Sequence, residues 1–236
     1  MPITQYITRT ARDMLMVPAV NRVVFKLRFF WYVYLIKRLT VYTDETQVLV
    51  PGYSLRMLKK GRTSDRPLHL IRPLSMVLGK SAHILSIGCR FETELLYLVG
   101  YGFKAKNIRG FDMISYSPWV ECGNMHALPH ADNSWDAVIL GWVLSYSETP
   151  EKAKEEVVRV ARNGALVAIG VSYYPPHMMT EQYMAEGEVR LRDQRLQTVA
   201  AFLKLFGDHV DIVHFQQDAP DPQKEGFCKV IFRVKK

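Results

Sequence analysis

The chain has 236 residues, of which 48% are hydrophobic and 23% charged. This is the composition of an ordinary globular protein, and its length suits one sizeable α/β domain with an appendage. Three cysteines, Cys89, Cys122 and Cys228, lie far apart without the paired spacing of a zinc site or a disulfide framework. We therefore expect no metal centre and no disulfide, and we predict a reducing, cytoplasmic location.

The net charge of +8 is unevenly distributed along the chain. Residues 1–60 hold 10 Lys and Arg against 3 Asp and Glu, which gives +7, whereas the other 176 residues hold 21 against 20. Such an asymmetry is typical of a segment that meets an anionic partner: nucleic acid, lipid headgroups or a phosphorylated substrate. We predict a basic, aromatic extension at 1–67, and a main domain at 68–236.

An aromatic stretch at 23–36 lies within this extension. It cannot cross a bilayer, because a spanning helix needs about 20 apolar residues and Lys26 and Arg28 interrupt this one. It could lie on a membrane surface with its aromatic side chains buried. The alternative, which we prefer because apolar residues occur all round the helix, is a helix that packs on the core or covers a substrate pocket as a lid.

The segment 83–112 has the order of a nucleotide-binding βαβ unit. An apolar strand at 83–87 stops at Gly88, a helix is predicted over 92–99, and a second strand over 107–112 ends in Asp112. Asp112 follows Gly88 by 112 − 88 = 24 positions. An acid at about this distance can bind both ribose hydroxyls of a nucleoside. The alternative is that Asp112 caps the turn after its own strand.

The rest of the chain continues the alternation of strands and helices. We predict a short element at 121–125, a strand at 137–140, a helix at 150–161 ended by Asn163-Gly164, a strand at 165–171, a mostly helical segment at 181–206, and closing strands at 210–216 and 227–234. This order predicts an α/β fold: a doubly wound, mostly parallel, Rossmann-like sheet with a final hairpin-like pair and an N-terminal helical extension.

Three stretches together resemble the class I S-adenosylmethionine-dependent methyltransferase family, in its small-molecule branch. They are Ile-Leu-Ser-Ile-Gly-Cys at 84–89, Gly-Phe-Asp-Met-Ile-Ser at 110–115, and 123–136, where Gly-Asn-Met-His-Ala-Leu-Pro precedes Asp-Asn-Ser-Trp-Asp. The resemblance implies seven strands and S-adenosyl-L-methionine as cofactor. We predict ten cofactor-binding residues, of which Arg90, Glu92 and Glu94 are proposed on their own chemistry and not from the resemblance: Gly88, Cys89, Arg90, Glu92, Glu94, Asp112, Met113, Asn124, Met125 and Gly141.

The chain departs from this family pattern in the glycine turn. Ser86 stands where the family usually has an acid, and Arg90 and Glu92 stand where it has glycines. In one interpretation Arg90 pairs with the cofactor carboxylate and Glu92 or Glu94 with its ammonium group. In the other, Arg90 is a solvated turn residue and Glu92 merely caps the helix. Asn124 replaces another common acid, but its oxygen can still accept a hydrogen bond from adenine.

The acceptor side is predicted from the carboxyl ends of the later strands, where this fold places its substrates. Tyr146, Tyr173 and His177 follow these strands. If the acceptor is a hydroxyl, His177 is the candidate general base. We therefore predict O-methylation of a small molecule, such as a sugar or metabolite hydroxyl, by an enzyme that is cytoplasmic or peripheral at the membrane.

Two other functions remain open from the sequence. The basic extension could direct the enzyme to RNA, although its aromatics are embedded among aliphatic residues instead of spaced as a stacking platform. The altered glycine turn could instead mark a non-catalytic protein that kept the fold. A dinucleotide oxidoreductase is disfavoured because Gly-x-Gly-x-x-Gly is absent.

Overall fold

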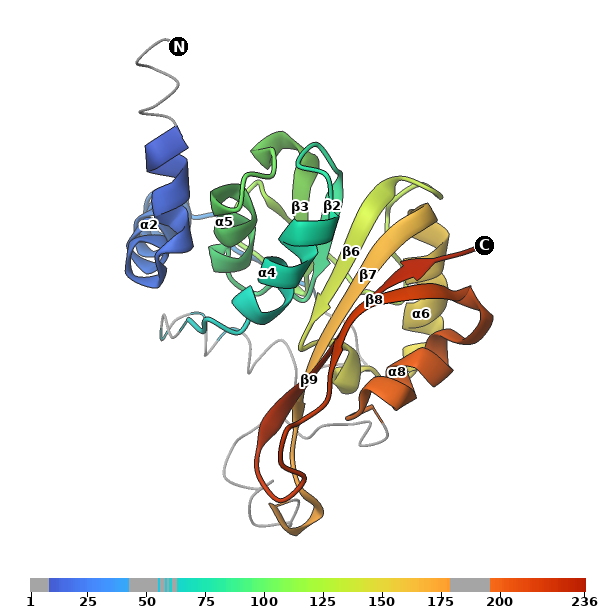
Figure 1. The fold of residues 1–236 in the computed structure, drawn as a ribbon. Helices are drawn as coiled ribbons and strands as arrows, with labels where there is room; N and C mark the ends of the chain where they lie inside the picture. The colour runs from blue at the N-terminus through green and yellow to red at the C-terminus, as the bar shows by residue number, and fades with distance from the viewer. Residues whose placement is uncertain (1–8, 43–54, 56–57, 59, 61–62, 179–195) are drawn as a thin grey trace. The chain divides into compact units, whose positions relative to one another are not determined.

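The computed structural model describes residues 9–42, 55, 58, 60, 63–178 and 196–236 (Figure 1). The chain divides into two compact units, Met1–Gly123 and Asn124–Lys236. Its main sheet has seven strands in the order β5-β3-β2-β6-β7-β9-β8. The pairs β2–β3, β3–β5 and β6–β7 are parallel, and β9 is antiparallel to both β7 and β8. The predicted doubly wound, mostly parallel α/β fold is therefore confirmed.

The described part of the first unit contains a helical N-terminal segment followed by the βαβ unit. Its elements are η1 Met14–Met16, α2 Pro18–Phe30, the π-helix η2 Trp31–Leu35, β1 Thr40–Val41, α4 Leu68–Val77, β2 Ile84–Ile87, α5 Thr93–Gly100, η3 Ala105–Asn107, β3 Ile108–Asp112, β4 Ile114–Ser115 and β5 Val120–Cys122. The predicted strand–turn–helix–strand order thus corresponds to β2, α5 and β3. All four residues of β2 are buried, as expected for a parallel strand covered on both faces.

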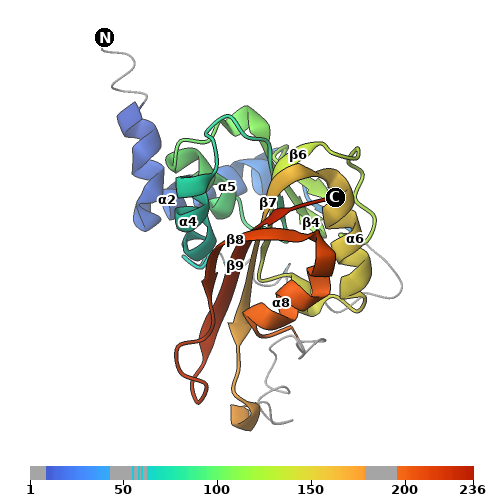
Figure 2. The same cartoon turned by 45° about the vertical axis from the view of Figure 1, so that its right-hand side comes forward.

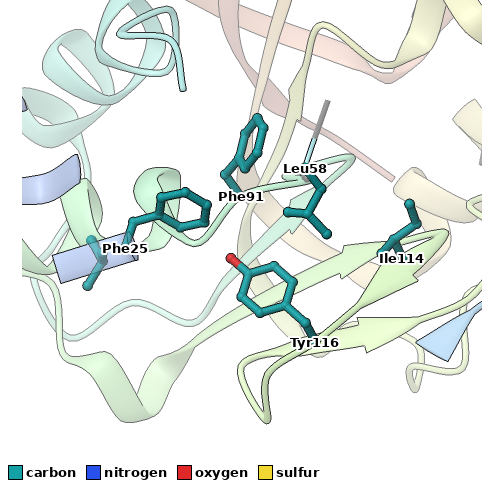
Figure 3. Close-up of a cluster of buried hydrophobic side chains, with 6 residues drawn as sticks. Phe25, Leu58, Phe91, Ile114 and Tyr116 are labelled. Carbon is teal, nitrogen blue, oxygen red and sulfur yellow. The ribbon is translucent and has the colours of Figure 1, made fainter. Parts of the chain in front are cut away.

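Helix α2 packs beside α5 through an aromatic cluster (Figure 1). Phe25 is fully buried, and its ring meets Phe91 at 5.4 Å and Tyr116 at 6.3 Å between centroids, both edge to face. Figure 3 shows these three rings pointing toward one another, with Leu58 and Ile114 beside them. Aromatic pairs in this geometry gain about 0.5–1.5 kcal/mol beyond their burial. The N-terminal extension is therefore part of the hydrophobic core next to the glycine turn.

The described part of the second unit carries the later strands and two helices. Its elements are β6 Trp135–Gly141, η4 Leu144–Tyr146, α6 Pro150–Val160, β7 Ala161–Tyr173, η5 Pro176–Met178, α8 Val199–Phe206, η6 Gly207–His209, β8 Val210–Gln217 and β9 Gly226–Val234. Both α6 and α8 lie on the same face of the strands (Figures 1 and 2). Phe206 of α8 packs edge to face on Phe232 of β9, with 5.0 Å between ring centroids. The antiparallel pair of β8 and β9 confirms the predicted closing pair.

One predicted boundary in this unit is wrong. Helix α6 ends at Val160, because Ala161 already has extended backbone (φ −68°, ψ 141°), and β7 begins there. Asn163 and Gly164, predicted to end the helix, lie inside β7, where Gly164 has φ 81°. The pairing register of β7 with β6 shifts between Trp135 and Ala137, and Gly164 lies in the irregular part of β7 that this shift creates. Of the predicted helical segment at 181–206, residues 181–195 lie outside the described chain.

Candidate functional site

The glycine turn of the first unit is held by the carboxylate at the end of β3. Gly88 has φ 76°, a conformation that glycine adopts without strain, and its amide donates to the carbonyl oxygen of Phe111 at 2.7 Å. Arg90 also has positive φ, at 38°, and its amide donates to Oδ2 of Asp112 at 2.8 Å. Oδ1 of Asp112 accepts from the amide of Ile114 at 3.1 Å. Asp112 therefore caps both its own strand and the glycine turn.

Capping and ribose binding are compatible in Asp112, because an ionised carboxylate has about four lone-pair positions. Burial raises the pKa of Asp112, and the hydrogen bonds from the amides of Arg90 and Ile114 oppose this shift. The neighbouring Met113 is half-buried, and its carbonyl oxygen accepts from the amide of Tyr42 at 2.7 Å. The ribose-binding role of Asp112 and the cofactor contact of Met113 stay predictions.

Cys89 is buried in the turn, where its side chain lies on the backbone of β3. A Cβ atom added at Gly110 would stand 2.6 Å from Sγ of Cys89 and 3.1 Å from Cγ2 of Val120. Glycine is therefore required at 110 so that the turn can approach the strand. Burial raises the pKa of the Cys89 thiol well above its usual range, which keeps the group protonated at neutral pH.

Glu94 brings an acid to the end of β2, where the family pattern has one in the strand itself. The side chain of Glu94 comes from the first turn of α5, and its carboxylate accepts a short hydrogen bond from Oγ of Ser86. Glu94 is only 4% exposed, and burial raises its pKa to about 7; the hydrogen bond from Ser86 opposes the shift, and the charge of Asp112 adds to it. Glu94 of helix α5 therefore places a carboxylate next to Ser86, the position at which the family pattern has an acid.

Glu92 has a protein cation as its partner. Its carboxylate is fully buried and accepts two hydrogen bonds from the guanidinium of Arg28, at 2.8 and 2.9 Å. The amide of Glu92 donates to the hydroxyl oxygen of Tyr116 at 3.0 Å. The Arg28 guanidinium also lies over the rings of Tyr32 and Trp119, at 5.3 and 5.1 Å from their centroids. Helix α2 is therefore joined to the turn by a shielded, bidentate ion pair.

Arg90, which we predicted to pair with the cofactor carboxylate, is half-buried in the turn. Its guanidinium lies 5.9 Å from the centroid of the Phe91 ring. The structure brings together Gly88, Cys89 and Arg90 of the turn, Asp112 at the end of β3 and Glu94 in the first turn of α5. Their contacts with a cofactor stay predictions.

Asn124, predicted to contact adenine, takes part in a hydrogen-bonded network of the second unit. Oδ1 of Asn124 lies 3.0 Å from the amide of His126 and 2.7 Å from its Nδ1, and Nε2 of His126 lies 2.6 Å from Oγ of Ser147. Ser147 in turn accepts from the amide of Thr149 at 3.2 Å. Burial lowers the pKa of His126, which favours the neutral ring that donates to Asn124 and accepts from Ser147. Met125 beside it is half-buried.

A row of aligned residues crosses the second unit near the carboxyl ends of β6 and β7. Gly141 pairs with Gly170, and Gly170 pairs with Lys229 of β9. Paired residues of neighbouring strands share a face of the sheet, so the two glycines, which have no side chain, lie in one row with the lysine. Lys229 is 6% exposed, and burial lowers its pKa. Within the described residues its ammonium group has no hydrogen-bond or ion-pair partner.

Trp142 follows Gly141 directly and lies on the same side as Lys229. Its ring packs edge to face on Phe227, two residues before Lys229 on the same strand, with 5.6 Å between centroids. The backbone of Trp142 has φ 58°, and its amide donates to the carbonyl oxygen of Gly170 at 2.8 Å. Its indole Nε1 is buried and finds no hydrogen-bond acceptor among the described residues.

The three predicted acceptor-side residues lie at the ends of strands in this unit, as expected. Tyr146 is half-buried in η4 after β6. Tyr173 ends β7 and donates its hydroxyl proton to the carbonyl oxygen of Pro222 at 3.0 Å, and His177 is exposed in η5. Neither a group of three metal-ligating side chains nor a helix long and apolar enough to span a bilayer occurs within the described ranges. The catalytic roles of Tyr146, Tyr173 and His177 stay predictions.

The sequence reasoning missed the roles of five residues that the structure makes prominent: Arg28, Ser86 as the partner of Glu94, the hydrogen-bonded pair of His126 and Ser147, and Lys229. Only Lys229 had a local signal, because it is the one cation within the apolar run Phe-Cys-Lys-Val-Ile-Phe at 227–232. The others depend on contacts between distant parts of the chain, such as the 64 positions that separate Arg28 from Glu92.

The fold and the turn define a nucleotide-binding α/β domain, and comparison with known proteins narrows this class. Residues 85–169 match the family model described as "Methyltransferase domain". No sequence match was found among curated proteins. This match covers 85 of the 236 residues, and together with the strand order it supports the predicted S-adenosylmethionine-dependent methyltransferase activity and its cofactor.

Solved structures of similar fold include one named methyltransferase and two proteins assigned as methyltransferases. The 1,6-didemethyltoxoflavin-N1-methyltransferase of Burkholderia thailandensis, solved with its substrate and S-adenosylhomocysteine, has 14% identity and a TM-score of 0.57, over 81% of this chain and 90% of that one. A protein assigned as a sarcosine dimethylglycine methyltransferase of Galdieria sulphuraria has 14% identity and a TM-score of 0.54, over 91% and 98%. A protein assigned as a methyltransferase, solved in complex with the Haloferax volcanii Trm112 methyltransferase activator, has 15% identity and a TM-score of 0.55. The match covers 80% of this chain and 96% of that one. At these identities the likeness concerns the fold.

Proposed function

We propose that the enzyme methylates an oxygen atom of a small molecule, a sugar or metabolite hydroxyl, in the cytoplasm. S-adenosylmethionine supplies an already activated methyl group. The chain's own residues must therefore bind the donor and the acceptor, align the two and exclude water. The acids of the first unit suit the donor: Asp112 for the ribose hydroxyls and Glu94 for the ammonium group. The free thiols of all three cysteines suit a reducing compartment.

The observation that carries the acceptor proposal is the pair of donors beside the two glycines of the second unit. The indole Nε1 of Trp142 is buried and Lys229 is 6% exposed as a residue, and neither donor has a hydrogen-bond acceptor within the described residues. Two such donors fit an oxygen that gains negative charge as it loses its proton. They do not fit an amine, which must present a lone pair to the methyl group without a cation nearby.

His177 and the two tyrosines complete this proposal. An exposed histidine after β7 can take the hydroxyl proton, and Tyr146 and Tyr173 offer aromatic faces and hydroxyl groups to a sugar or metabolite ring. The Burkholderia relative, which was solved with a bound small molecule, supports an acceptor of this size. The basic N-terminal segment favours RNA less, because its exposed aromatic side chains lie among exposed aliphatic ones, such as Val23, Leu27 and Leu35, and do not form a separate stacking platform.

The test is to incubate the enzyme with S-adenosylmethionine carrying an isotopically labelled methyl group and a cell extract separated into small-molecule and RNA fractions. We expect label in the small-molecule fraction, on oxygen by the chemical shift of the new methyl signal. Label on nitrogen, or label in the RNA fraction that ribonuclease removes, would overturn the proposal. Absence of both label and S-adenosylhomocysteine binding would identify a non-catalytic protein.

Lys229 gives a sharper version of this test. Lys229→Met should abolish most of the methyl transfer while S-adenosylhomocysteine binds as before, because the lysine belongs to the acceptor side. Lys204→Met, which removes an exposed cation of α8, is the matched control and should transfer at the wild-type rate. Equal activity of the Lys229→Met variant would exclude the lysine from acceptor recognition.

A further inference from the structure

Helix α2 and the π-helix η2 that continues it carry an apolar stripe on their outer side. Six side chains at a spacing of three or four positions form it, each more than half exposed: Val23 57%, Leu27 66%, Phe30 54%, Trp31 53%, Tyr34 57% and Leu35 56%. Residues at this spacing share one face of a helix. The 18 residues from Pro18 to Leu35 extend over roughly 27 Å. Large apolar side chains that are gathered and exposed on one helix face mark an interaction site.

The opposite side of the same helix is fixed in the core, so the stripe cannot turn inward. Phe25 is fully buried, and Arg28 makes the bidentate ion pair with Glu92. Asn21, also fully buried, donates from Nδ2 to the carbonyl oxygens of Leu15 at 3.0 Å and Thr93 at 3.2 Å. The stripe is therefore a permanent outer surface of the first unit, held in place by contacts next to the cofactor turn.

The cations of this segment are sorted between the two sides. Three arginines are neutralised by carboxylates of the same unit: Arg12 by Asp13, Arg22 by Asp65 and Arg28 by Glu92. Lys26 on α2, and Lys37 and Arg38 directly after η2, are exposed and have no ion pair within the described residues. The outer surface therefore combines an apolar, aromatic stripe with positive charges that nothing in the described chain balances.

We propose that this outer surface of α2 and η2 docks flat on an anionic lipid bilayer. Aliphatic and aromatic side chains along one helix face, with cations at its margins, are what an interfacial helix requires. Trp31 and Tyr34 are of the residue types that favour the boundary between headgroups and acyl chains. Lys26, Lys37 and Arg38 lie where they can reach anionic headgroups. This docking is independent of the methyl acceptor, and it commits the basic extension to lipid.

A second copy of the chain fits this surface less well than lipid does. A two-fold symmetric contact would place the same patch on itself and bring the unbalanced cations of both copies together. A protein partner would need acidic residues around an apolar groove. An anionic membrane supplies both the apolar medium and the negative charge without any shape requirement.

The test measures binding of the full chain to phosphatidylcholine vesicles with and without phosphatidylglycerol, by flotation at increasing salt. We expect binding to the anionic vesicles that weakens as salt rises, and much weaker binding to pure phosphatidylcholine. Leu27→Gln with Trp31→Gln should weaken binding about tenfold or more, because two large apolar side chains no longer enter the bilayer. Lys37→Gln with Arg38→Gln should weaken it roughly fivefold per cation.

The controls are matched to these variants. Met76→Gln removes an 86% exposed apolar side chain of α4 outside the stripe, and Lys204→Gln removes an exposed cation of α8; both should bind vesicles as the wild type does. Wild-type binding by the Leu27/Trp31 variant would overturn the proposal, as would failure of the wild type to float with anionic vesicles. A dimer that sedimentation velocity detects and the Leu27/Trp31 variant abolishes, without vesicle binding, would identify a contact between copies instead.

Discussion

The buried acid beside the glycine turn makes a measurable prediction about stability. Glu94 has a pKa of about 7 in the folded chain against 4.5 in its ordinary state, because burial penalises its charged form. Each pH unit between these values corresponds to about 1.4 kcal/mol, so ionised Glu94 costs the folded state about 3 kcal/mol at high pH. The favourable contribution of the protonated form is complete below pH 4.5 and is lost as the pH rises through 7.

This loss sets the size of the expected effect. Between pH 6 and 8 the folded chain without cofactor should lose about 1.3 kcal/mol through Glu94 alone, or roughly 3–5 °C in melting temperature for a chain of this size. Glu94→Gln keeps an oxygen that can accept from Ser86 and has no charge to bury. The variant should melt higher than the wild type at pH 8, and this advantage should shrink at pH 6.

The measurement is a set of melting curves by differential scanning fluorimetry from pH 5.5 to 8, for the wild type, Glu94→Gln and the control Glu155→Gln. Glu155 is exposed on α6, so its variant should follow the wild type at every pH. Comparison of variants removes the contributions of all other titrating groups. If Glu94→Gln and the wild type show the same dependence of melting temperature on pH, the buried, titrating acid that we describe does not exist.

Cofactor binding should show the opposite trend with pH. If ionised Glu94 pairs with the ammonium group, S-adenosylhomocysteine should bind the wild type about tenfold more tightly at pH 8 than at pH 6, because the ionised fraction rises about tenfold. Glu94→Gln should bind it weakly and with little pH dependence. Calorimetry measures both values. An unchanged affinity of Glu94→Gln at pH 8 would remove the ammonium role and leave the stability result standing.

Two further predictions concern the contacts that hold the turn. Arg28→Met should destabilise the chain by about 3 kcal/mol in urea denaturation, because it leaves the buried carboxylate of Glu92 unpaired. Adding Glu92→Gln should recover part of this loss. If Arg28→Met alone causes no loss, the ion pair does not stabilise the fold. Gly110→Ala should lower the free energy of unfolding by about 1–3 kcal/mol, because its Cβ collides with Sγ of Cys89. Adding Cys89→Ala should relieve this loss, and the control Gly79→Ala, at a site with open space, should not show it. Additive effects of the Gly110 and Cys89 substitutions would refute the collision.

Local patterns in the sequence were sufficient for most of the sheet. The apolar runs that became β2, β6 and β9 are bounded by glycines or turn residues, and their burial leaves little choice of structure. The end of α6 was misplaced because glycine after a helix usually marks its C-terminus. Here Gly164, with φ 81°, lies within β7 instead, at a level where that strand's register with β6 is irregular. Pairing between strands, which no local pattern reports, decided the boundary.

The candidate site was less predictable, because its unusual residues depend on partners far away in the sequence. The pattern identified Gly88 and Asp112 as parts of a turn and a strand end, and the structure places them there. It left two interpretations open for Glu92, and neither included Arg28. A side chain at position 28 that neutralises one at 92 is visible only once α2 packs against α5.

The departures from the family pattern are matched by compensating residues, and this argues against loss of function by decay. Ser86 replaces an acid, and Glu94 restores a carboxylate at the same strand end through the hydrogen bond between them. Glu92 replaces a glycine, and Arg28 neutralises it with two hydrogen bonds. The carboxylate of Glu94 therefore stays our candidate partner for the ammonium group of the cofactor.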